Sequence, residues 1–328
     1  MQIIMKKTIF IILGIASGIV IFELVLSFIH GYNFDSMACN TYTTSHKDSH
    51  MFCYRSSKLM GYELVPNIRK NINSLGMRDR EYSFSKPEGV FRILVLGDST
   101  TAQLGIKNRW ADVLEDKLNS HGKYEVLNAA VSGYNLYHYW AYLMNKGMEL
   151  DPDLVITAFC LNDIESWDCV RTILIDKNVG IHFSVSNRNG KLMMQPTLDI
   201  NPWLYRRSFL YRFIVSRSLD RKERDTGMPQ KMLSEMRSIT GNNIAAVIFP
   251  YLKPLNNYTA KELMEYNTTV GVLDTLGIDY LDLHQYSTRD LIDIKNSRTT
   301  KDDFIHFGDN TSIYFADIIH KWLTDRTQ

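Results

Sequence analysis

The clearest indication of the fold is the sequence FRILVLGDSTTAQLGI at residues 91–106. Residues 93–97 form an unbroken apolar run, and the polar residues 98–101 follow directly. An apolar run of this length that ends in glycine and small polar residues is typical of a strand buried on both faces of a parallel sheet. Ligands of open α/β sheets bind just beyond the carboxyl ends of such strands. The sequence therefore predicts that Ser99 lies where folds of this kind carry out chemistry.

Further apolar stretches follow, and segments with helical spacing separate them. We expect strands over residues 93–97, 124–130, 154–159, 244–249 and 279–283, and helices over residues 110–118, 136–148, 203–224, 260–276 and 310–323. Strands that alternate with helices are joined by right-handed crossovers, which place the strands in one sheet with helices on both faces. The sequence thus predicts an α/β domain with a doubly wound sheet of about five parallel strands.

Four short motifs resemble the blocks of one family of serine hydrolases. The motif GDS at residues 97–99 resembles block I of the GDSL, or SGNH, hydrolase family, and VSGYN at residues 131–135 resembles block II. LND at residues 161–163 resembles block III, and the spacing Asp303-x-x-His306 resembles block V. The motifs occur in the family's order. The resemblance implies a three-layer α/β/α, flavodoxin-like fold.

The resemblance also implies roles for residues of blocks I and V. Ser99 would be the nucleophile, and His306 the base that removes its proton and later protonates the leaving alkoxide. Asp303 would hold the other ring nitrogen of His306, and Asp302 is the alternative orienting residue, ranked below Asp303. The implied reaction is hydrolysis of an acyl ester through an acyl-serine, with no metal or organic cofactor. Taken alone, Ser99 would be interpreted as a helix cap.

Three groups are the candidate donors to the oxyanion of that reaction. They are the backbone N–H groups of Ser99 and Gly133 and the side chain of Asn162, as the resemblance implies. Each has a simpler interpretation, because Gly133 would equally suit a tight turn and Asn162 a helix N-cap. The family usually has glycine two residues before the block III asparagine, where this chain has Cys160.

The N-terminal segment is apolar after two lysines. Residues 1–7 include Lys6 and Lys7, and residues 8–29 are long enough to cross the hydrocarbon core of a bilayer as a helix. A cleaved signal peptide usually has a shorter apolar region and a small-residue cleavage site, so we favour an uncleaved anchor. The lysines then predict a cytoplasmic N-terminus, with the rest of the chain outside. Glu23 is costly in lipid and is expected to be protonated, near the outer interface, or paired with a partner helix.

Residues 30–90 are expected to form an extended linker, or collar, between the anchor and a hydrolase domain over residues 91–328. Within it, NINSLGMR at residues 71–78 is similar to a segment found before the GDS strand in membrane-anchored members of the family. We interpret this segment as packing against the edge of the sheet.

All four cysteines follow the predicted anchor, at Cys39, Cys53, Cys160 and Cys169. An even number in an oxidising compartment indicates disulfides. Sequence proximity favours pairing the first with the second and the third with the fourth, although three pairings are open. The first two cysteines together with His46 and His50 could instead bind zinc, but their spacing fits no standard zinc module. We therefore predict no metal site.

Residues 168–225 are expected to be an insertion, polar and irregular as far as residue 198. The helix predicted over residues 203–224 carries basic residues at Arg206, Arg207, Arg212, Arg217, Arg221, Lys222 and Arg224. A solvated helix face is the commoner interpretation of such a run. The alternative is contact with anionic lipid headgroups or an acidic polymer.

Charge and composition exclude some functions. The 328 residues include 37 basic and 36 acidic side chains, for a net charge of +1, which gives no indication of a nucleic-acid partner. The resemblance to exported, membrane-anchored members of the family suggests an O-acyl ester, most simply acetate, on an extracytoplasmic carbohydrate. A lipid ester, transfer of the acyl group to a sugar hydroxyl, and a degenerate hydrolase fold kept as a binding module are the alternatives. The sequence indicates no oligomeric state.

Overall fold

The computed structural model describes most of the chain. The described residues are 2–30, 54–57, 60–67, 71–103, 105–164, 182–188, 191–198, 204, 208, 210–211, 214, 227–287 and 303–326. The helix predicted over residues 203–224 therefore lies largely outside the described residues.

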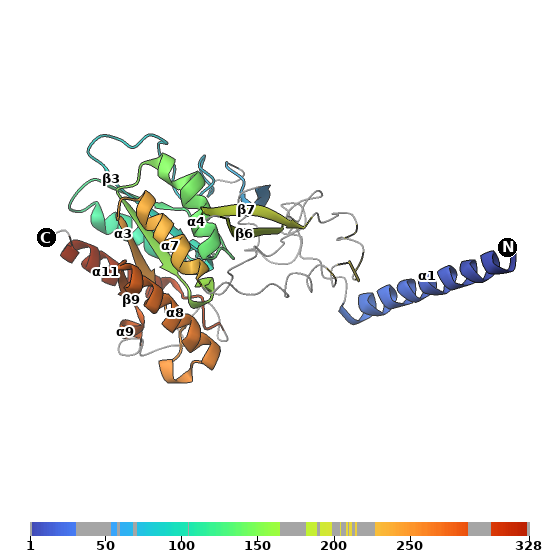
Figure 1. The fold of residues 1–328 in the computed structure, drawn as a ribbon. Coiled ribbons are helices and arrows are strands. Elements are labelled where there is room, and N and C mark those ends of the chain that lie inside the picture. Colours follow the sequence, from blue (N-terminus) through green and yellow to red (C-terminus); the bar gives the residue numbers. More distant parts are fainter. Residues whose placement is uncertain are drawn as a thin grey trace.

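A five-stranded sheet forms the centre of the fold (Figure 1). Its strands are β3 (Phe91–Gly97), β4 (Tyr124–Asn128), β5 (Leu154–Phe159), β8 (Ile244–Ile248) and β9 (Asp279–Asp282). They lie in the order β4-β3-β5-β8-β9, and every neighbouring pair is parallel. This confirms the predicted sheet of five parallel strands.

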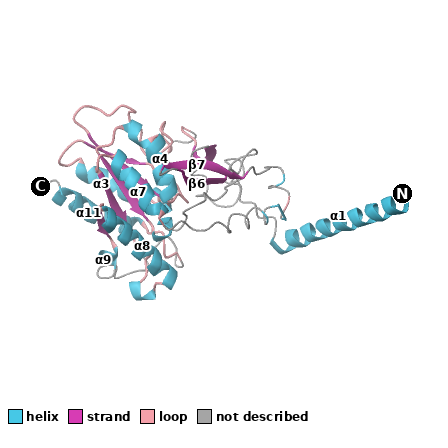
Figure 2. Cartoon of the chain, in the orientation of Figure 1, coloured by secondary structure: helices cyan, strands magenta, loops and turns pink. Residues whose placement is uncertain are grey.

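Helices cover both faces of this sheet (Figure 2). The longer ones are α3 (Trp110–Leu118), α4 (Leu136–Asn145), α7 (Met228–Ile239), α8 (Ala260–Leu276) and α11 (Asp309–Arg326). The shorter ones are α2 (Ser99–Ala102), α9 (His284–Ser287) and three 3-10 turns, η2 (Gly147–Leu150), η3 (Leu161–Ile164) and η4 (Leu255–Asn257). The predicted three-layer α/β/α arrangement is confirmed.

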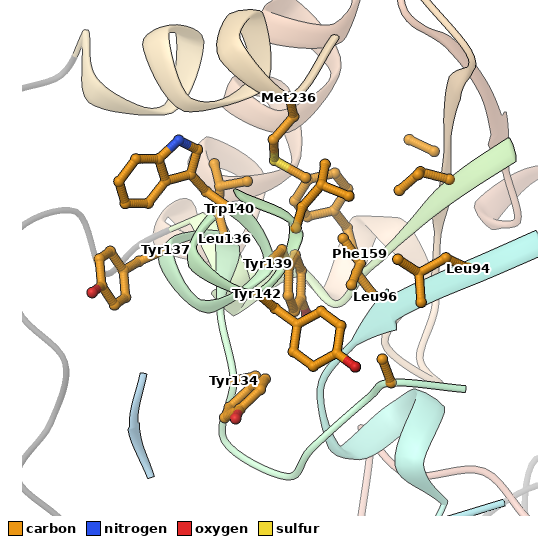
Figure 3. Close-up of a cluster of buried hydrophobic side chains, with 14 of the residues drawn as sticks. Leu94, Leu96, Tyr134, Leu136, Tyr137, Tyr139, Trp140, Tyr142, Phe159 and Met236 are labelled. Carbon is orange, nitrogen blue, oxygen red and sulfur yellow. The ribbon is translucent and has the colours of Figure 1, made fainter. Parts of the chain in front are cut away.

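Each face of the sheet packs against its own set of helices. Side chains of α3 and α11 share one buried cluster with Ile93 and Val95 of β3. Side chains of α4, α7 and α8 share the other with Leu94 and Leu96, and Figure 3 shows part of this second cluster. Successive residues of a strand point to opposite faces, so β3 is buried on both. This is the reason for its unbroken apolar run.

One helix ends earlier than predicted. The pattern predicted a helix over residues 136–148, but α4 ends at Asn145, and Lys146 leaves the helical conformation with φ −140° and ψ −40°. Gly147 then comes close to β3, where an added Cβ would lie 2.9 Å from Cδ2 of Leu94. Residues 147 and 148 of the predicted helix therefore lie in the 3-10 turn η2, which packs against the sheet.

Two small antiparallel sheets lie outside the central one. One pairs β1 (Tyr54–Ser57) with β2 (Gly61–Leu64), and the other pairs β6 (His182–Arg188) with β7 (Lys191–Leu198). The prediction that the insertion is irregular as far as residue 198 is therefore wrong. The dipeptide Asn189-Gly190 between β6 and β7 is a strong hairpin signal that the sequence reasoning did not use.

The predicted linker contributes to the core. Met60, Ile72 and Met77 are almost fully buried and belong to the same cluster as Leu94. Tyr82 is also buried, and its hydroxyl donates to Glu115 of α3 at 2.8 Å and to the carbonyl of Val126 at 3.0 Å. The described residues 60–67 and 71–90 of the predicted linker are therefore integrated into the fold.

The N-terminal segment forms one long helix, α1 (Gln2–His30). In the part of the chain that the structure describes, it is the single helix long and apolar enough to cross a membrane, and an N-terminal signal sequence would have the same character. Glu23 of α1 accepts hydrogen bonds from the hydroxyl of Ser208 and the backbone N–H of Leu210, both at 3.0 Å. These partners belong to the same chain as α1.

Candidate active site

Ser99 is the first residue of a one-turn helix at the carboxyl end of β3. Asp98 caps this helix, because its Oδ1 accepts from the backbone N–H of Thr100 at 2.8 Å and from the Thr100 hydroxyl at 2.7 Å. The other oxygen of Asp98 lies 3.2 Å from Oγ of Ser99. The sharp change from strand to helix places Ser99, partly buried, at the end of the central strand.

Gly97 permits this sharp change of direction. A Cβ added at Gly97 would lie 2.6 Å from both Cβ and Oγ1 of Thr101, whose side chain is fully buried. Real Cβ atoms do not come so close to other heavy atoms, because the atoms would overlap. The densely packed interior leaves Thr101 no room to move away. Glycine at position 97 therefore allows α2 to pack directly against the end of β3.

The loop before α11 brings an imidazole to Ser99. Nε2 of His306 lies 2.8 Å from Oγ of Ser99, and Nδ1 of His306 lies 2.8 Å from Oδ2 of Asp303. The other oxygen of Asp303 accepts from the backbone N–H groups of Ile305 and His306, each at 2.9 Å. The structure thus brings together all three residues that the sequence predicted to interact. Asp302, the alternative orienting residue, lies outside the described residues.

The carboxylate of Asp303 stays ionised at neutral pH. Burial raises its pKa, but the backbone N–H groups of His306 and Ile305 and the imidazole of His306 lower it more, so the pKa lies below its usual value. A carboxylate accepts hydrogen bonds and donates none, which assigns the proton of the imidazole to Nδ1. Nε2 is then the acceptor for the Ser99 proton.

Neighbouring residues hold the histidine loop in place. Phe307, directly after His306, is buried and stacks on Phe249 with ring centroids 5.4 Å apart. The backbone N–H of Leu252 donates to the carbonyl of Phe304 at 2.7 Å. Side-chain packing and a backbone hydrogen bond on either side of His306 therefore fix its position relative to β8.

The other two candidate oxyanion residues follow the strands next to β3. Gly133 comes after β4; it is exposed and has a φ of +80°, a backbone conformation that favours glycine. Asn162 comes after β5 and is exposed as the second residue of η3, so it is not an N-cap. Because the carboxyl ends of parallel strands meet at one edge of the sheet, both residues flank the end of β3 that carries Ser99.

Comparison with known proteins identifies the family. Residues 95–310 match the GDSL-like lipase/acylhydrolase family. The chain belongs to this family. It is therefore a hydrolase of carboxylic esters, and the candidate site lies within the matched residues. Comparison with curated protein sequences found no match.

Several solved structures resemble this GDSL hydrolase at low identity. The lipase/acylhydrolase from Enterococcus faecalis is 14% identical, with 72% of this chain and 96% of that chain covered and a TM-score of 0.45. The acetyl xylan esterase AlAXEase is 14% identical, with coverages of 71% and 99% and a TM-score of 0.45. A catalytic mutant of the acetylxylan esterase Axe2 from Geobacillus stearothermophilus is 11% identical, with coverages of 70% and 93% and a TM-score of 0.44. Similarity at this level carries no information about the substrate of this chain.

One buried carboxyl group of this GDSL hydrolase, that of Asp163, shapes the site in a way that the sequence did not predict. Oδ2 of Asp163 accepts from the hydroxyl of Tyr139 and from the backbone N–H of Cys160, both at 2.7 Å. These bonds fix the turn that carries Asn162. Burial, and next the charge of Asp98, raise the pKa of Asp163 well above its usual value. Asp163 belongs to the LND motif, but the motif does not show the role of its carboxyl group, because the partners come from a different helix and from its own backbone turn.

Cys160 lies directly before this turn. It is buried, and its carbonyl accepts from the N–H of Asp163 at 3.0 Å. It forms no disulfide with any residue that the structure describes, and the other three cysteines lie outside those residues.

The hypothetical zinc ligands, including His46 and His50, also lie outside the described residues. Across the described ranges, no group of three or more metal-binding side chains gathers.

Proposed function

We propose that this chain is a membrane-anchored serine esterase that hydrolyses O-acyl esters, most simply acetyl esters, on a carbohydrate outside the cytoplasm. The observation that carries the proposal is the chain of two 2.8 Å contacts from Ser99 Oγ through the His306 imidazole to the Asp303 carboxylate. Membership of an acylhydrolase family supports the ester as the bond that is cleaved. We assign Ser99, His306 and Asp303 as nucleophile, general base and orienting acid.

The first half of the reaction forms an acyl-serine. Oγ of Ser99 attacks the carbonyl carbon of the ester while Nε2 of His306 takes the hydroxyl proton, so that a C–O bond forms and the carbonyl oxygen becomes an oxyanion. The imidazolium then protonates the departing alkoxide as its bond to the carbonyl carbon breaks. Asp303 stabilises the imidazolium through its hydrogen bond to Nδ1 and takes up no proton itself.

The second half releases the acyl group. Water attacks the acyl-serine, and His306 takes one proton from it and returns a proton to Oγ of Ser99 as the carboxylic acid leaves. In both halves an oxyanion develops, and we assign its donors as the backbone N–H groups of Ser99 and Gly133 and the side chain of Asn162. Losing one such donor typically costs about a hundredfold to a thousandfold in rate.

The apolar helix α1 supports the proposed location of the substrate outside the cytoplasm. An uncleaved anchor with Lys6 and Lys7 in the cytoplasm would hold the hydrolase domain outside, where acylated polysaccharides are found. The same tether would keep the site near lipids, so lipid esters are the competing substrate class. Transfer of the acyl group to a sugar hydroxyl would use the same acyl-serine, with the sugar in place of water.

Release assays with the purified full chain test the substrate class. We expect acetate release from acetylated polysaccharide, little fatty-acid release from phospholipid vesicles, and neither from a Ser99→Ala variant. Fatty-acid release without acetate release would assign the lipid substrate. Acetylated acceptor with no free acetate would assign the transferase. Protease protection of spheroplasts and N-terminal sequencing of the membrane fraction would test the proposed orientation and the uncleaved anchor.

A further inference from the structure

The one-turn helix that carries Ser99 cannot be stable by itself. A helix of four residues, Ser99–Ala102, makes too few internal hydrogen bonds to repay the cost of ordering it. The carbonyl groups at the end of such a helix have no partners within it. Its conformation, and with it the direction of the Ser99 side chain, must therefore be imposed by residues outside the helix.

Side chains from two distant segments bind these carbonyl groups. Nδ2 of Asn128, at the end of β4, donates to the carbonyl of Thr101 at 3.1 Å. Nη1 of Arg78 donates to the carbonyl of Ala102 at 2.7 Å and also to that of Gln103. The guanidinium group thus bridges the last residue of α2 and the residue after it. Its charge lies next to the negative ends of these backbone dipoles.

Gln103 has a strained backbone conformation, which the hydrogen bonds from Arg78 help to hold. Its φ of 45° is left-handed, a conformation that costs a non-glycine residue roughly 1 kcal/mol or more. Its side-chain oxygen accepts from the backbone N–H of Trp110 at 2.7 Å and from the hydroxyl of Ser312 at 3.1 Å. The N–H of Gln103 donates to the carbonyl of Ser99 at 3.0 Å. The backbone conformation of Gln103 is therefore coupled directly to the backbone of Ser99.

The segment before β3 is built to hold Arg78 in position. Oδ1 of Asn73 accepts from the backbone N–H groups of Leu75 and Met77, at 3.0 and 2.9 Å. Gly76, with a φ of +77°, completes the turn between them. Nη1 of Arg109 then donates to the carbonyl of Arg78. These contacts fix the backbone on either side of Arg78, and the Arg78 side chain extends from there to α2.

The residue after Arg78 connects the same segment to β4. Oδ2 of Asp79 accepts from the backbone N–H of Asn128 at 2.9 Å, and Oδ1 lies 3.4 Å from Arg109. Arg78 itself is 9% exposed. Burial and the nearby Arg109 lower the pKa of Arg78 to about 10, which leaves the guanidinium charged at neutral pH. One hydrogen-bonded network thus joins the predicted linker, β4 and α2.

We infer that Arg78 is a positioning residue for Ser99, holding the nucleophile helix by its carbonyl end. Arg78 lies outside the residues that match the family, 95–310, so the inference adds a functional element from the N-terminal part of the chain. It rests on the proposed role of Ser99 as nucleophile. Misplacing a reacting group by about 1 Å can cost roughly a hundredfold in rate, which is the scale of effect expected here.

Arg80 provides a matched control. It belongs to the same segment, but its Nε pairs with Glu115 of α3 and its guanidinium lies 4.3 Å from the centroid of the Tyr82 ring. An Arg80→Met variant therefore loses an ion pair and a ring contact in the same segment without loss of the bonds to α2. If the segment served stability alone, neither Arg78→Met nor Arg80→Met would lower kcat of the folded protein.

The experiment compares Arg78→Met, Arg78→Lys and Arg80→Met in the full chain. The measurements are kcat and KM with p-nitrophenyl acetate, the rate constant for labelling by a fluorophosphonate probe, and the melting temperature. We expect Arg78→Met to lower kcat and the labelling rate about tenfold to a hundredfold with KM within about twofold. Arg78→Lys should fall between it and the original chain. Arg80→Met should keep kcat even where its melting temperature falls.

The outcomes separate this inference from the proposed function. Normal kcat and labelling in folded Arg78→Met would overturn the inference. If that variant does not fold, Arg78→Lys decides: a lower labelling rate at unchanged KM supports the inference, and an unchanged rate overturns it. Failure of the probe to label the original chain, or labelling that persists in Ser99→Ala, would instead refute the role of Ser99, and the inference with it.

Discussion

Nε2 of His306 lies 2.8 Å from Oγ of Ser99, although the two residues are 207 positions apart in the sequence. Contacts around α11 help to hold them together. Oδ1 of Asp309, the first residue of α11, accepts from the backbone N–H groups of Lys107 and Asn108, at 3.0 and 2.7 Å. The segment after the nucleophile helix is thus bonded to the helix that follows the histidine loop.

Replacement of Asp303 by asparagine should nearly abolish activity. The amide can no longer fix the Nδ1–H tautomer of His306 or stabilise its charged form, and the comparable change in serine proteases lowers kcat about ten-thousandfold. The measurement is kcat for p-nitrophenyl acetate. Asp302→Asn is the matched control one position away and should keep most of the activity. A larger loss in Asp302→Asn than in Asp303→Asn would show that the orienting residue is wrongly assigned.

Removal of the Asn162 side chain should reduce rate without reducing stability. Asn162 is exposed, so Asn162→Ala leaves no buried group unpaired. If it donates to the oxyanion, kcat should fall about a hundredfold to a thousandfold while the melting temperature stays the same. Asn256→Ala, at another exposed asparagine, is the control and should change neither quantity. A kcat for Asn162→Ala within about threefold of the original would remove it from the site.

A methyl group at Gly97 should disturb both packing and activity. The added Cβ would lie 2.6 Å from Thr101 Cβ, which forces α2 away from β3. We expect a loss of about 1–3 kcal/mol in the free energy of unfolding and a fall in kcat of about tenfold or more. Gly271→Ala is the control, because nothing lies within 4 Å of its added Cβ, and in helix α8 alanine should stabilise by roughly 0.5–1 kcal/mol. Equal unfolding free energies for Gly97→Ala and the original chain would contradict the packing argument.

His138 should make the fold sensitive to acid. Burial lowers its pKa to about 3, and the ring stacks on Tyr134 with centroids 4.4 Å apart. Between about pH 6.5 and pH 3 the unfolded chain binds a proton here that the folded chain does not, so acid favours unfolding. The contribution to the free energy of unfolding should fall by roughly 1.4 kcal/mol for each pH unit below about 6.5.

A comparison with His138→Gln isolates this contribution. Buried carboxyl groups such as Asp98 and Asp163, whose pKa values are raised chiefly by burial, act in the opposite direction in both proteins and cancel in the difference. Urea unfolding at pH 7.0, 6.0 and 5.0 should therefore show a steeper loss of stability in the original chain than in the variant. If the free energy of unfolding falls equally with pH in the two proteins, the result would contradict the lowered pKa of His138.

The sequence predicted the sheet because strands buried on both faces of a parallel sheet need continuous apolar runs. The run at residues 93–97 and the later apolar stretches gave every central strand to within a few residues of its ends. Ser99, Asp303 and His306 were found because their short motifs resemble those of a known family. Their spatial convergence was an expectation that only the fold could test.

The missed features depend on contacts between distant residues. Arg78 was interpreted as part of a packing segment, because nothing in its local pattern shows that its side chain reaches the carbonyl of Ala102, 24 positions away. The role of Asp163 depends on the hydrogen bond that it accepts from Tyr139, a residue of a different helix. The β6–β7 hairpin, in contrast, is predictable from the sequence, since Asn189-Gly190 is a local turn signal.

The most direct test of the account is covalent labelling of Ser99. A fluorophosphonate probe forms a bond to a serine oxygen, with loss of fluoride, where a neighbouring base accepts the hydroxyl proton. The full chain, labelled and digested, should carry the probe on the peptide that contains Ser99, and neither Ser99→Ala nor a folded His306→Ala variant should be labelled at a comparable rate. Labelling of His306→Ala at the original rate, or no labelling of the folded original chain, would contradict the proposed site.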